Sequence, residues 1–127
     1  MVAAPPGLER GWFIEPTLFA DVNNSMRVAR EEIFGPVLVA IPFDDVDEAV
    51  AIANDSDYGL SGAVYAQDLE LADQIARRIR TGQVFINSAG TCVNEPFGGF
   101  KQSGLGREGG VEGIEAFLET KLIAANL

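Results

Sequence analysis

The chain has 127 residues, of which 47% are hydrophobic and 22% charged, so it can form a packed domain or part of a larger one. Its formal net charge is −10, and most of the acidic excess precedes Ala66, with 3 Lys or Arg against 11 Asp or Glu. Such a surface repels phosphate backbones and anionic lipid, so we expect neither a nucleic-acid nor a membrane partner.

The sequence contains a single cysteine, Cys92, and no histidine. One cysteine excludes an internal disulfide and a CxxC metal or redox site, and we predict no metal site. Without histidine, Ser-His-Asp and Cys-His arrangements within this chain are excluded. Residues 1–6 lack the features of a signal peptide, and no apolar run reaches the roughly 20 residues of a membrane span, so we expect a cytoplasmic protein.

Short elements are predicted in the first part of the chain. Residues 1–10 are expected to be an irregular lead-in, and apolar runs at 12–14 and 17–19 flank Pro16, which has no N–H to donate and so indicates an edge strand or two broken strands. Ser25 is a candidate N-cap for a helix over 25–31. The uninterrupted apolar run at 37–41 predicts a strand buried on both faces.

A clear helix signal follows. Asp45 and Glu48 have the spacing of a capping box. Apolar residues recur at helical spacing behind them and predict one buried face, made of Val46, Ala49, Val50 and Ala53. A strand is then expected at 62–66.

A further helix is predicted over residues 69–80, with Asp73 and Arg77 as an i,i+4 ion pair and Gly82 as its end. Its buried stripe is formed by Ala72, Ile75, Ala76 and Ile79. A short strand follows at 84–86. Strands and helices that alternate in this way predict an α/β fold with a parallel sheet.

The last part of the chain is rich in glycine. Residues 87–110 are predicted to be a long loop without regular structure, which is unusual within a compact domain. A helix over 111–118 would turn Val111, Ile114 and Leu118 inward, and an apolar strand is expected at 122–125.

The segment from Gly104 to Gly109 satisfies the pattern G-x-G-x-x-G, which marks dinucleotide binding only inside a βαβ unit. The residues before it do not form a buried strand. Only 18 residues follow it, too few for a helix, a strand and a ribose-binding acid. We therefore interpret these glycines as turn formers.

Two carboxylates, an aromatic residue and a Gly-Pro turn follow one another at Glu31–Glu32–Ile33–Phe34–Gly35–Pro36. A carboxylate can accept hydrogen bonds from both hydroxyls of a ribose, and an aromatic ring could pack beneath the sugar. From the residues alone, the simpler interpretation is stronger: two solvated helix carboxylates and a core phenylalanine.

Four segments, in order along the chain, resemble signatures of the NAD(P)-dependent aldehyde dehydrogenase superfamily. The resemblance covers about residue 7 to the end and corresponds to the last quarter of a full enzyme. It implies a partial catalytic domain at 11–120 and an oligomerisation strand at 121–127. The four segments are GWFIEPTLF at 11–19, EEIFGPV at 31–37, a stretch from Asn54 to Leu60, and PFGGFK at 96–101 followed by SG at 103–104 and GRE at 106–108.

The resemblance also implies roles for individual residues. Glu32 and Phe34 match residues at the nicotinamide ribose of NAD(P), which favours the ribose interpretation of that segment. Phe97 matches an aromatic residue of the aldehyde pocket, and residues 88–95 match a variable stretch at its entrance. We expect NAD or NADP in the full-length enzyme, no tight cofactor binding by this chain alone, an aldehyde substrate and a homo-oligomer.

The residues that perform the family's chemistry lie upstream of residue 12 in its members: a cysteine nucleophile, a glutamate base and the oxyanion donors. We therefore predict that the chain alone has no catalytic residue and is inactive. A second hypothesis is a non-enzymatic association module that pairs through its edge strand. A third is a Cys92-dependent enzyme, which is disfavoured because no cation or histidine surrounds the thiol.

Overall fold

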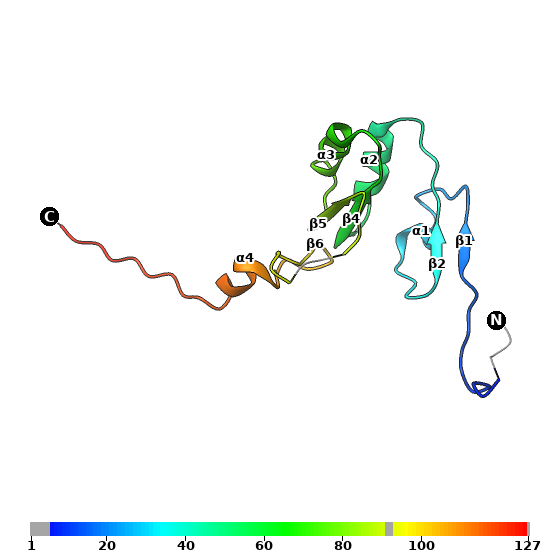
Figure 1. Cartoon of the computed structure of the whole chain (residues 1–127), viewed down its shortest axis with the longest axis horizontal. Helices are drawn as coiled ribbons and strands as arrows, with labels where there is room; N and C mark the ends of the chain where they lie inside the picture. The colour runs from blue at the N-terminus through cyan, green and yellow to red at the C-terminus, as the bar shows by residue number, and fades with distance from the viewer. Residues whose placement is uncertain (1–5, 91–92, 127) are drawn as a thin grey trace. The chain divides into compact units, whose positions relative to one another are not determined.

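The computed structural model describes residues 6–90 and 93–126, and Cys92 therefore lies outside the described residues. The chain divides into two compact units, residues 1–55 and residues 56–127 (Figure 1). Each unit contains a pair of parallel strands together with helices. The predicted mixed α/β structure with parallel strands is confirmed.

The first unit contains β1 (Thr17–Phe19), α1 (Arg27–Arg30), β2 (Val37–Val39) and α2 (Val46–Asn54). Strands β1 and β2 are parallel, with Leu18 opposite Leu38. The predicted strand at 12–14 is absent. Pairing begins only after Pro16, where the Thr17 N–H donates to the Pro36 carbonyl over 2.8 Å.

Helix α1 is shorter than predicted, and Ser25 is not its N-cap. Met26 occupies the cap position and makes no side-chain capping bond. The backbone N–H and the hydroxyl of Ser25 both donate to the Asn23 side-chain oxygen, over 2.9 and 2.8 Å. Asn23 thus forms a local turn that competes with helix initiation at Ser25.

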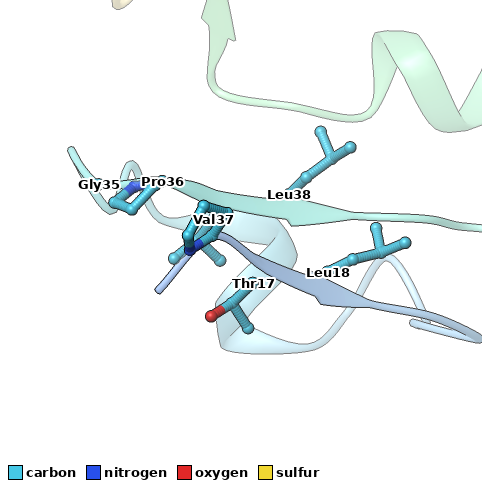
Figure 2. A pocket seen from close by; sticks show the side chains of 7 residues that line it. Thr17, Leu18, Gly35, Pro36, Val37 and Leu38 are labelled. Atoms are coloured by element: carbon cyan, nitrogen blue, oxygen red, sulfur yellow. The ribbon is translucent and has the colours of Figure 1, made fainter. Parts of the chain in front are cut away.

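The expectation that β2 is buried on both faces is wrong for this chain. Leu18 and Leu38 lie side by side on one face of the pair (Figure 2) and are 62% and 66% exposed. The short strands do have the predicted apolar sequence. What the described part of the first unit lacks is an element that covers this face.

Helix α2 begins as predicted. The Asp45 carboxylate accepts from the Glu48 N–H over 2.8 Å, while the Glu48 carboxylate accepts from the Asp44 N–H over 2.7 Å, one residue before the expected position. Val50 is buried, whereas Ala53 is exposed despite its place on the predicted face.

The second unit contains β3 (Tyr58–Gly59), β4 (Ser61–Val64), α3 (Leu69–Ala76), β5 (Gln83–Ile86), β6 (Phe100–Lys101) and α4 (Gly110–Glu115). Strands β4 and β5 are parallel, and α3 connects them. Ala72 on α3 is completely buried, and the predicted ion pair between Asp73 and Arg77 forms at 2.7 Å. Helix α3 ends before residue 80, and single turns continue it.

The β4–β5 pair is closed at its carboxyl end by Asn87. The Asn87 backbone N–H donates to the Val64 carbonyl over 2.9 Å. Its side-chain amide donates to the Ala66 carbonyl over 2.7 Å and accepts from the Ala66 N–H over 2.9 Å. The residue has a positive φ of 50°, which asparagine tolerates better than most residues.

The segment 87–110 is more regular than predicted. It contains β6, which pairs antiparallel with β3, and a bridge between Phe97 and Glu108. Both features depend on partners distant in sequence or on glycine turns, which a local pattern does not reveal.

The end of the chain departs from its predictions. Val111, Ile114 and Leu118 are 68%, 62% and 66% exposed rather than turned inward, and residues 122–125 do not form a strand. Their apolar pattern is real, but an edge strand or a helix face needs a neighbour to pair with or pack against. In the part of the chain that the structure describes, no helix is long and apolar enough to cross a membrane.

The buried core is small. The buried hydrophobic residues among those described are Val22, Val50, Val64 and Ala72.

Candidate functional site

The two carboxylates that follow α1 have different surroundings. Glu31 Oε1 lies 2.8 Å from Arg27 Nε in an exposed i,i+4 pair. The hydrogen bond from Arg27 lowers the pKa of Glu31 and raises the pKa of Arg27. The Glu31 carboxylate is therefore already paired with a side chain of α1.

Glu32 is exposed, and among the described residues no hydrogen bond or ion pair engages its carboxylate. An ionised carboxylate offers two oxygens that accept hydrogen bonds and none that donate. Glu32 can therefore bind a ligand that presents two donors, such as a vicinal diol.

Phe34 has an unusual backbone. Its φ is 53°, in the left-handed region, and its side chain is 91% exposed. A bulky residue in this region costs on the order of 1–3 kcal/mol, and such strain is found preferentially at functional sites. The conformation holds the ring away from the protein, where it can pack against a ligand. The expectation that Phe34 could be a core residue is therefore wrong for this structure.

Glu32 and Phe34 line the same surface hollow, which has a volume of about 360 Å³. The lining also includes the ion-paired Glu31 and aliphatic residues such as Val28, Ala29, Val37 and Val39. A free carboxylate and an exposed ring beside aliphatic side chains are suited to a sugar hydroxyl pair and the flat group attached to it. The structure thus brings together the two residues for which the sequence suggested a cofactor role.

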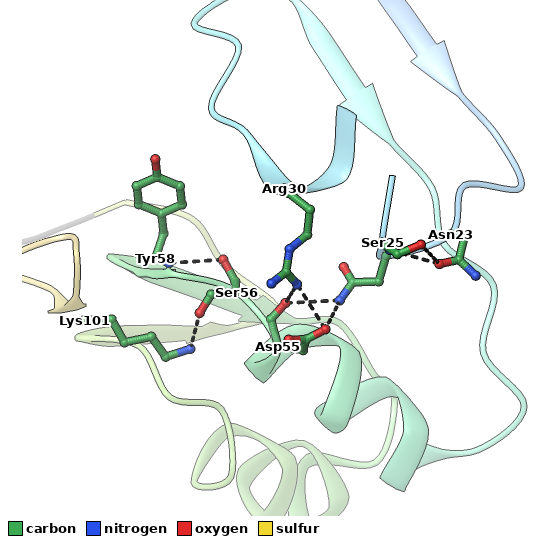
Figure 3. A network of polar contacts seen from close by, with 8 residues as sticks. Asn23, Ser25, Arg30, Asp55, Ser56, Tyr58 and Lys101 are labelled. Carbon is green, nitrogen blue, oxygen red and sulfur yellow. Dashed lines mark hydrogen bonds and ion pairs between the residues drawn. The ribbon is translucent and has the colours of Figure 1, made fainter. Parts of the chain in front are cut away.

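The segment that carries these two residues is attached to the end of α2. Arg30 Nη1 donates to the Asp55 carbonyl over 2.5 Å and lies 3.0 Å from Asp55 Oδ2 (Figure 3). Asn24 Nδ2 donates to the same two oxygens, over 3.1 and 2.8 Å. These residues are distant in sequence, so no local pattern predicted this network.

Phe97 belongs to the second unit, where it is 37% exposed. Phe97 and Glu108 exchange two backbone hydrogen bonds of 2.7 Å each. Arg107 Nη1 donates to the carbonyls of Gly99 and Gly106 over 2.9 and 2.8 Å, and its guanidinium lies 5.5 Å from the centre of the Phe100 ring. These contacts close the hairpin over residues 97–108 and fix the position of Phe97.

Glycines allow this hairpin to approach β5. A Cβ placed on Gly82 would lie 1.6 Å from the Gly98 carbonyl oxygen, and one placed on Gly98 would lie 2.2 Å from the Gly106 carbonyl oxygen. The contact is backbone against backbone and leaves no room for a side chain. Gly82 and Gly98 thus have a packing role that any side chain would disrupt.

Comparison with known proteins identifies the family. The family model "Aldehyde dehydrogenase family" matches residues 2–123. The chain belongs to the aldehyde dehydrogenase family. Curated relatives from Staphylococcus saprophyticus and Staphylococcus aureus, whose names include aldehyde dehydrogenase, are 56% identical over 120 residues. These matches cover 94% of this chain but 25% of each relative, so the chain spans about a quarter of their length.

Solved structures are similar to the chain in both sequence and fold. An aldehyde dehydrogenase from Mycobacterium tuberculosis, complexed with NAD+, is 53% identical with a TM-score of 0.85, covering 91% of this chain and 24% of that one. A variant of aldehyde dehydrogenase C from Pseudomonas syringae, complexed with NAD+ and octanal, is 54% identical with a TM-score of 0.88, covering 97% and 26%.

Proposed function

We propose that this chain is the C-terminal part of an NAD(P)-dependent aldehyde dehydrogenase, which oxidises an aldehyde to a carboxylic acid through a thioester. In this proposal Glu32 and Phe34 contact the nicotinamide ribose, and Phe97 forms part of the aldehyde pocket. The observation that carries the proposal is the pairing of an unengaged carboxylate with an exposed, strained aromatic residue on one hollow. The NAD+ complexes of the two similar structures support the choice of cofactor.

The chemistry of the residues fits that cofactor. A nicotinamide held by these residues would supply the hydride acceptor that the oxidation needs. Glu32 accepts hydrogen bonds from the two ribose hydroxyls, and Phe34 packs against the sugar and the ring that it bears. Together they orient the nicotinamide and limit its rotation.

The proposed aldehyde-pocket residue, Phe97, belongs to the second unit. Phe97 is partly exposed on a hairpin that is fixed by backbone bonds and by Arg107. A rigid aromatic wall of this kind favours an aldehyde with an apolar chain. The octanal bound by the Pseudomonas syringae relative agrees with that class of substrate.

Catalysis requires a thiolate nucleophile, a base for thioester hydrolysis and oxyanion donors. We assign none of these to the residues of this chain, which is therefore proposed to be inactive by itself. A homo-oligomeric enzyme in the cytoplasm completes the proposal.

A pair of adjacent substitutions tests the cofactor role. In an enzyme of family length that carries this chain as its matching quarter, Glu32→Gln is expected to raise the KM for NAD(P). A lost charge-assisted hydrogen bond costs about 1–3 kcal/mol, which corresponds to about 5- to 150-fold. Glu31→Gln is the matched control, and it should change the same KM by less than about twofold because Glu31 belongs to an exposed ion pair. Equal effects of the two substitutions would refute the assignment.

Inactivity of the isolated chain is tested separately. The purified 127-residue chain, given NAD+ or NADP+ and octanal, is expected to produce no reduced cofactor. Turnover above the buffer rate would contradict the proposal, and its loss in Cys92→Ala would point to the Cys92-dependent alternative.

A second candidate function is association without catalysis. The extended residues near the end of the chain carry Leu122 and Ile123, which are 88% and 86% exposed. A free apolar segment of this kind can add as a strand to the sheet edge of another chain. Gel filtration of the chain with and without residues 121–127 tests this function. Loss of assembly on truncation would support it, whereas monomeric profiles for both forms would exclude it.

A further inference from the structure

We propose that Asp55 is a positioning residue for the cofactor site: through Arg30 and Asn24 it fixes the segment that carries Glu32 and Phe34. This inference rests on the proposed function, because it concerns how the same site is held in place. Asp55 itself is not among the residues proposed to contact the ribose. It acts only through the two side chains that bind it.

Asp55 collects four interactions on two oxygens. Its carbonyl accepts from Arg30 Nη1 and Asn24 Nδ2, over 2.5 and 3.1 Å. Its carboxylate Oδ2 lies 3.0 Å from Arg30 Nη1 and 2.8 Å from Asn24 Nδ2. The partners are 25 and 31 residues distant in sequence, so the network joins segments that are not neighbours along the chain.

The segment needs such an anchor because α1 is weak by itself. It has four residues, no side-chain N-cap and no buried residue. A helix of this length is unstable in water without tertiary contacts. Arg30 is its last residue, and Glu32 and Phe34 follow within four positions.

The other end of the network is well held. Asp55 is the C-cap of α2, and its N–H donates to the carbonyls of Ala51 and Ile52. Helix α2 is fixed at its start by the Asp45 cap and in its middle by the buried Val50. The contacts of Asp55 therefore hold the four-residue helix α1 at the end of the capped, nine-residue helix α2.

The side chains of Arg30 and Asp55 are 34% and 67% exposed, and those of Arg77 and Asp73 are 75% and 51% exposed. Both are Arg–Asp pairs, but the second joins residues on one helix and links no distant segments. Asp73 thus provides a matched control that removes the same chemistry without removing the anchor.

The test compares Asp55→Ala with Asp73→Ala in the family-length enzyme that carries this chain. In Asp55→Ala, amide hydrogen exchange at residues 27–35 should accelerate at least tenfold and the KM for NAD+ should rise at least fivefold. The KM for octanal should change by less than twofold. Asp55→Asn, which retains a side-chain oxygen acceptor, should recover part of both effects, and Asp73→Ala should show neither. If Asp55→Ala lowers the yield of folded enzyme, Arg30→Gln tests the same network from its other side.

The positioning role is overturned if exchange at 27–35 is unchanged in Asp55→Ala and in Arg30→Gln, or if both KM values rise together. Failure of the proposed function gives a different result. In that case Glu32→Gln leaves the KM for NAD+ unchanged, while the exchange at 27–35 still accelerates in Asp55→Ala.

Discussion

The two parallel strand pairs differ in how they are connected. Between β4 and β5 the eight-residue helix α3 packs with its Ala72 completely buried, and Val64 on β4 is 9% exposed. Between β1 and β2 the four-residue helix α1 buries no residue, and the face with Leu18 and Leu38 is open.

This difference has a physical origin. Parallel strands need a crossover, and their sheets are stable when helices cover both faces. A helix of two turns can cover a strand pair, whereas a helix of one turn cannot. The β4–β5 pair therefore builds a local core, while the β1–β2 pair keeps one apolar face open in the described part of the first unit.

The largest expected effect concerns the β4–β5 pair, which has its own local core. Gly82→Ala places a Cβ 1.6 Å from the Gly98 carbonyl oxygen, so either β5 or the hairpin over 97–108 must move. We expect a loss of about 4 kcal/mol in the free energy of unfolding, because backbone atoms cannot yield cheaply. Gly106→Ala, with no heavy atom within 4 Å, should change it by about 0.5 kcal/mol or less. Urea unfolding measures both, and equal stabilities would show that the close contact is not required.

The stability of the β1–β2 pair is expected to respond differently to mutation in the isolated chain and in the family-length enzyme. Leu38→Ala in the isolated chain removes a side chain that is 66% exposed, and should change stability by about 0.5 kcal/mol or less. We expect this face to be covered in the family-length enzyme, so the same change should cost about 2 kcal/mol or more there. Val64→Ala, already buried, should cost a similar amount in both contexts. A small effect of Leu38→Ala in the complete enzyme would mean that the face remains open there.

Helix caps provide a finer comparison. Asp68 accepts from the N–H groups of Glu70 and Leu71 at the start of α3, as Asp45 does from Glu48 at the start of α2. Replacement of either by alanine should cost about 1 kcal/mol. Amide hydrogen exchange should differ: Asp68→Ala should loosen β4 and β5 as well as α3, whereas Asp45→Ala should loosen α2 alone. Identical exchange patterns would contradict the view that α3 carries the core of its strand pair.

The smallest expected effect is the pH dependence of α1. Arg27 lowers the pKa of the exposed Glu31, so the pair stabilises the folded turn above the ordinary glutamate pKa. This contribution is lost as the pH falls through the lowered pKa. An NMR titration of the Glu31 carboxyl should give a midpoint below that in Arg27→Gln. A midpoint that Arg27→Gln does not move would show that the pair does not form in solution.

Local signals in the sequence predicted the elements that depend on local interactions. The capping position of Asp45 and the buried Ala72 follow from spacing over a few residues, and the parallel strands follow from the alternation of strands with helices. The same periodicity identified an apolar face on the last helix. It could not tell that Val111 and Ile114 would be exposed, because a pattern identifies a face and not what covers it.

The candidate site was predictable only in part. Residue chemistry suggested a ribose acceptor at Glu32, and the family resemblance made that interpretation preferable. Phenylalanine normally avoids the left-handed backbone region, so nothing in the sequence predicted the positive φ of Phe34. The role of Asp55 depends on partners 25 and 31 residues away, which no local spacing identifies.

Asn87 has a consequence for how the fold tolerates change. Its side chain occupies the hydrogen-bonding positions that the next residue of a strand would otherwise fill. The ladder between β4 and β5 thus ends on a side chain, and the backbone leaves the sheet at that point with a positive φ. Insertions or deletions beyond Asn87 therefore need not shift the strand register, so the loop can diversify in length while the scaffold beneath it stays constant.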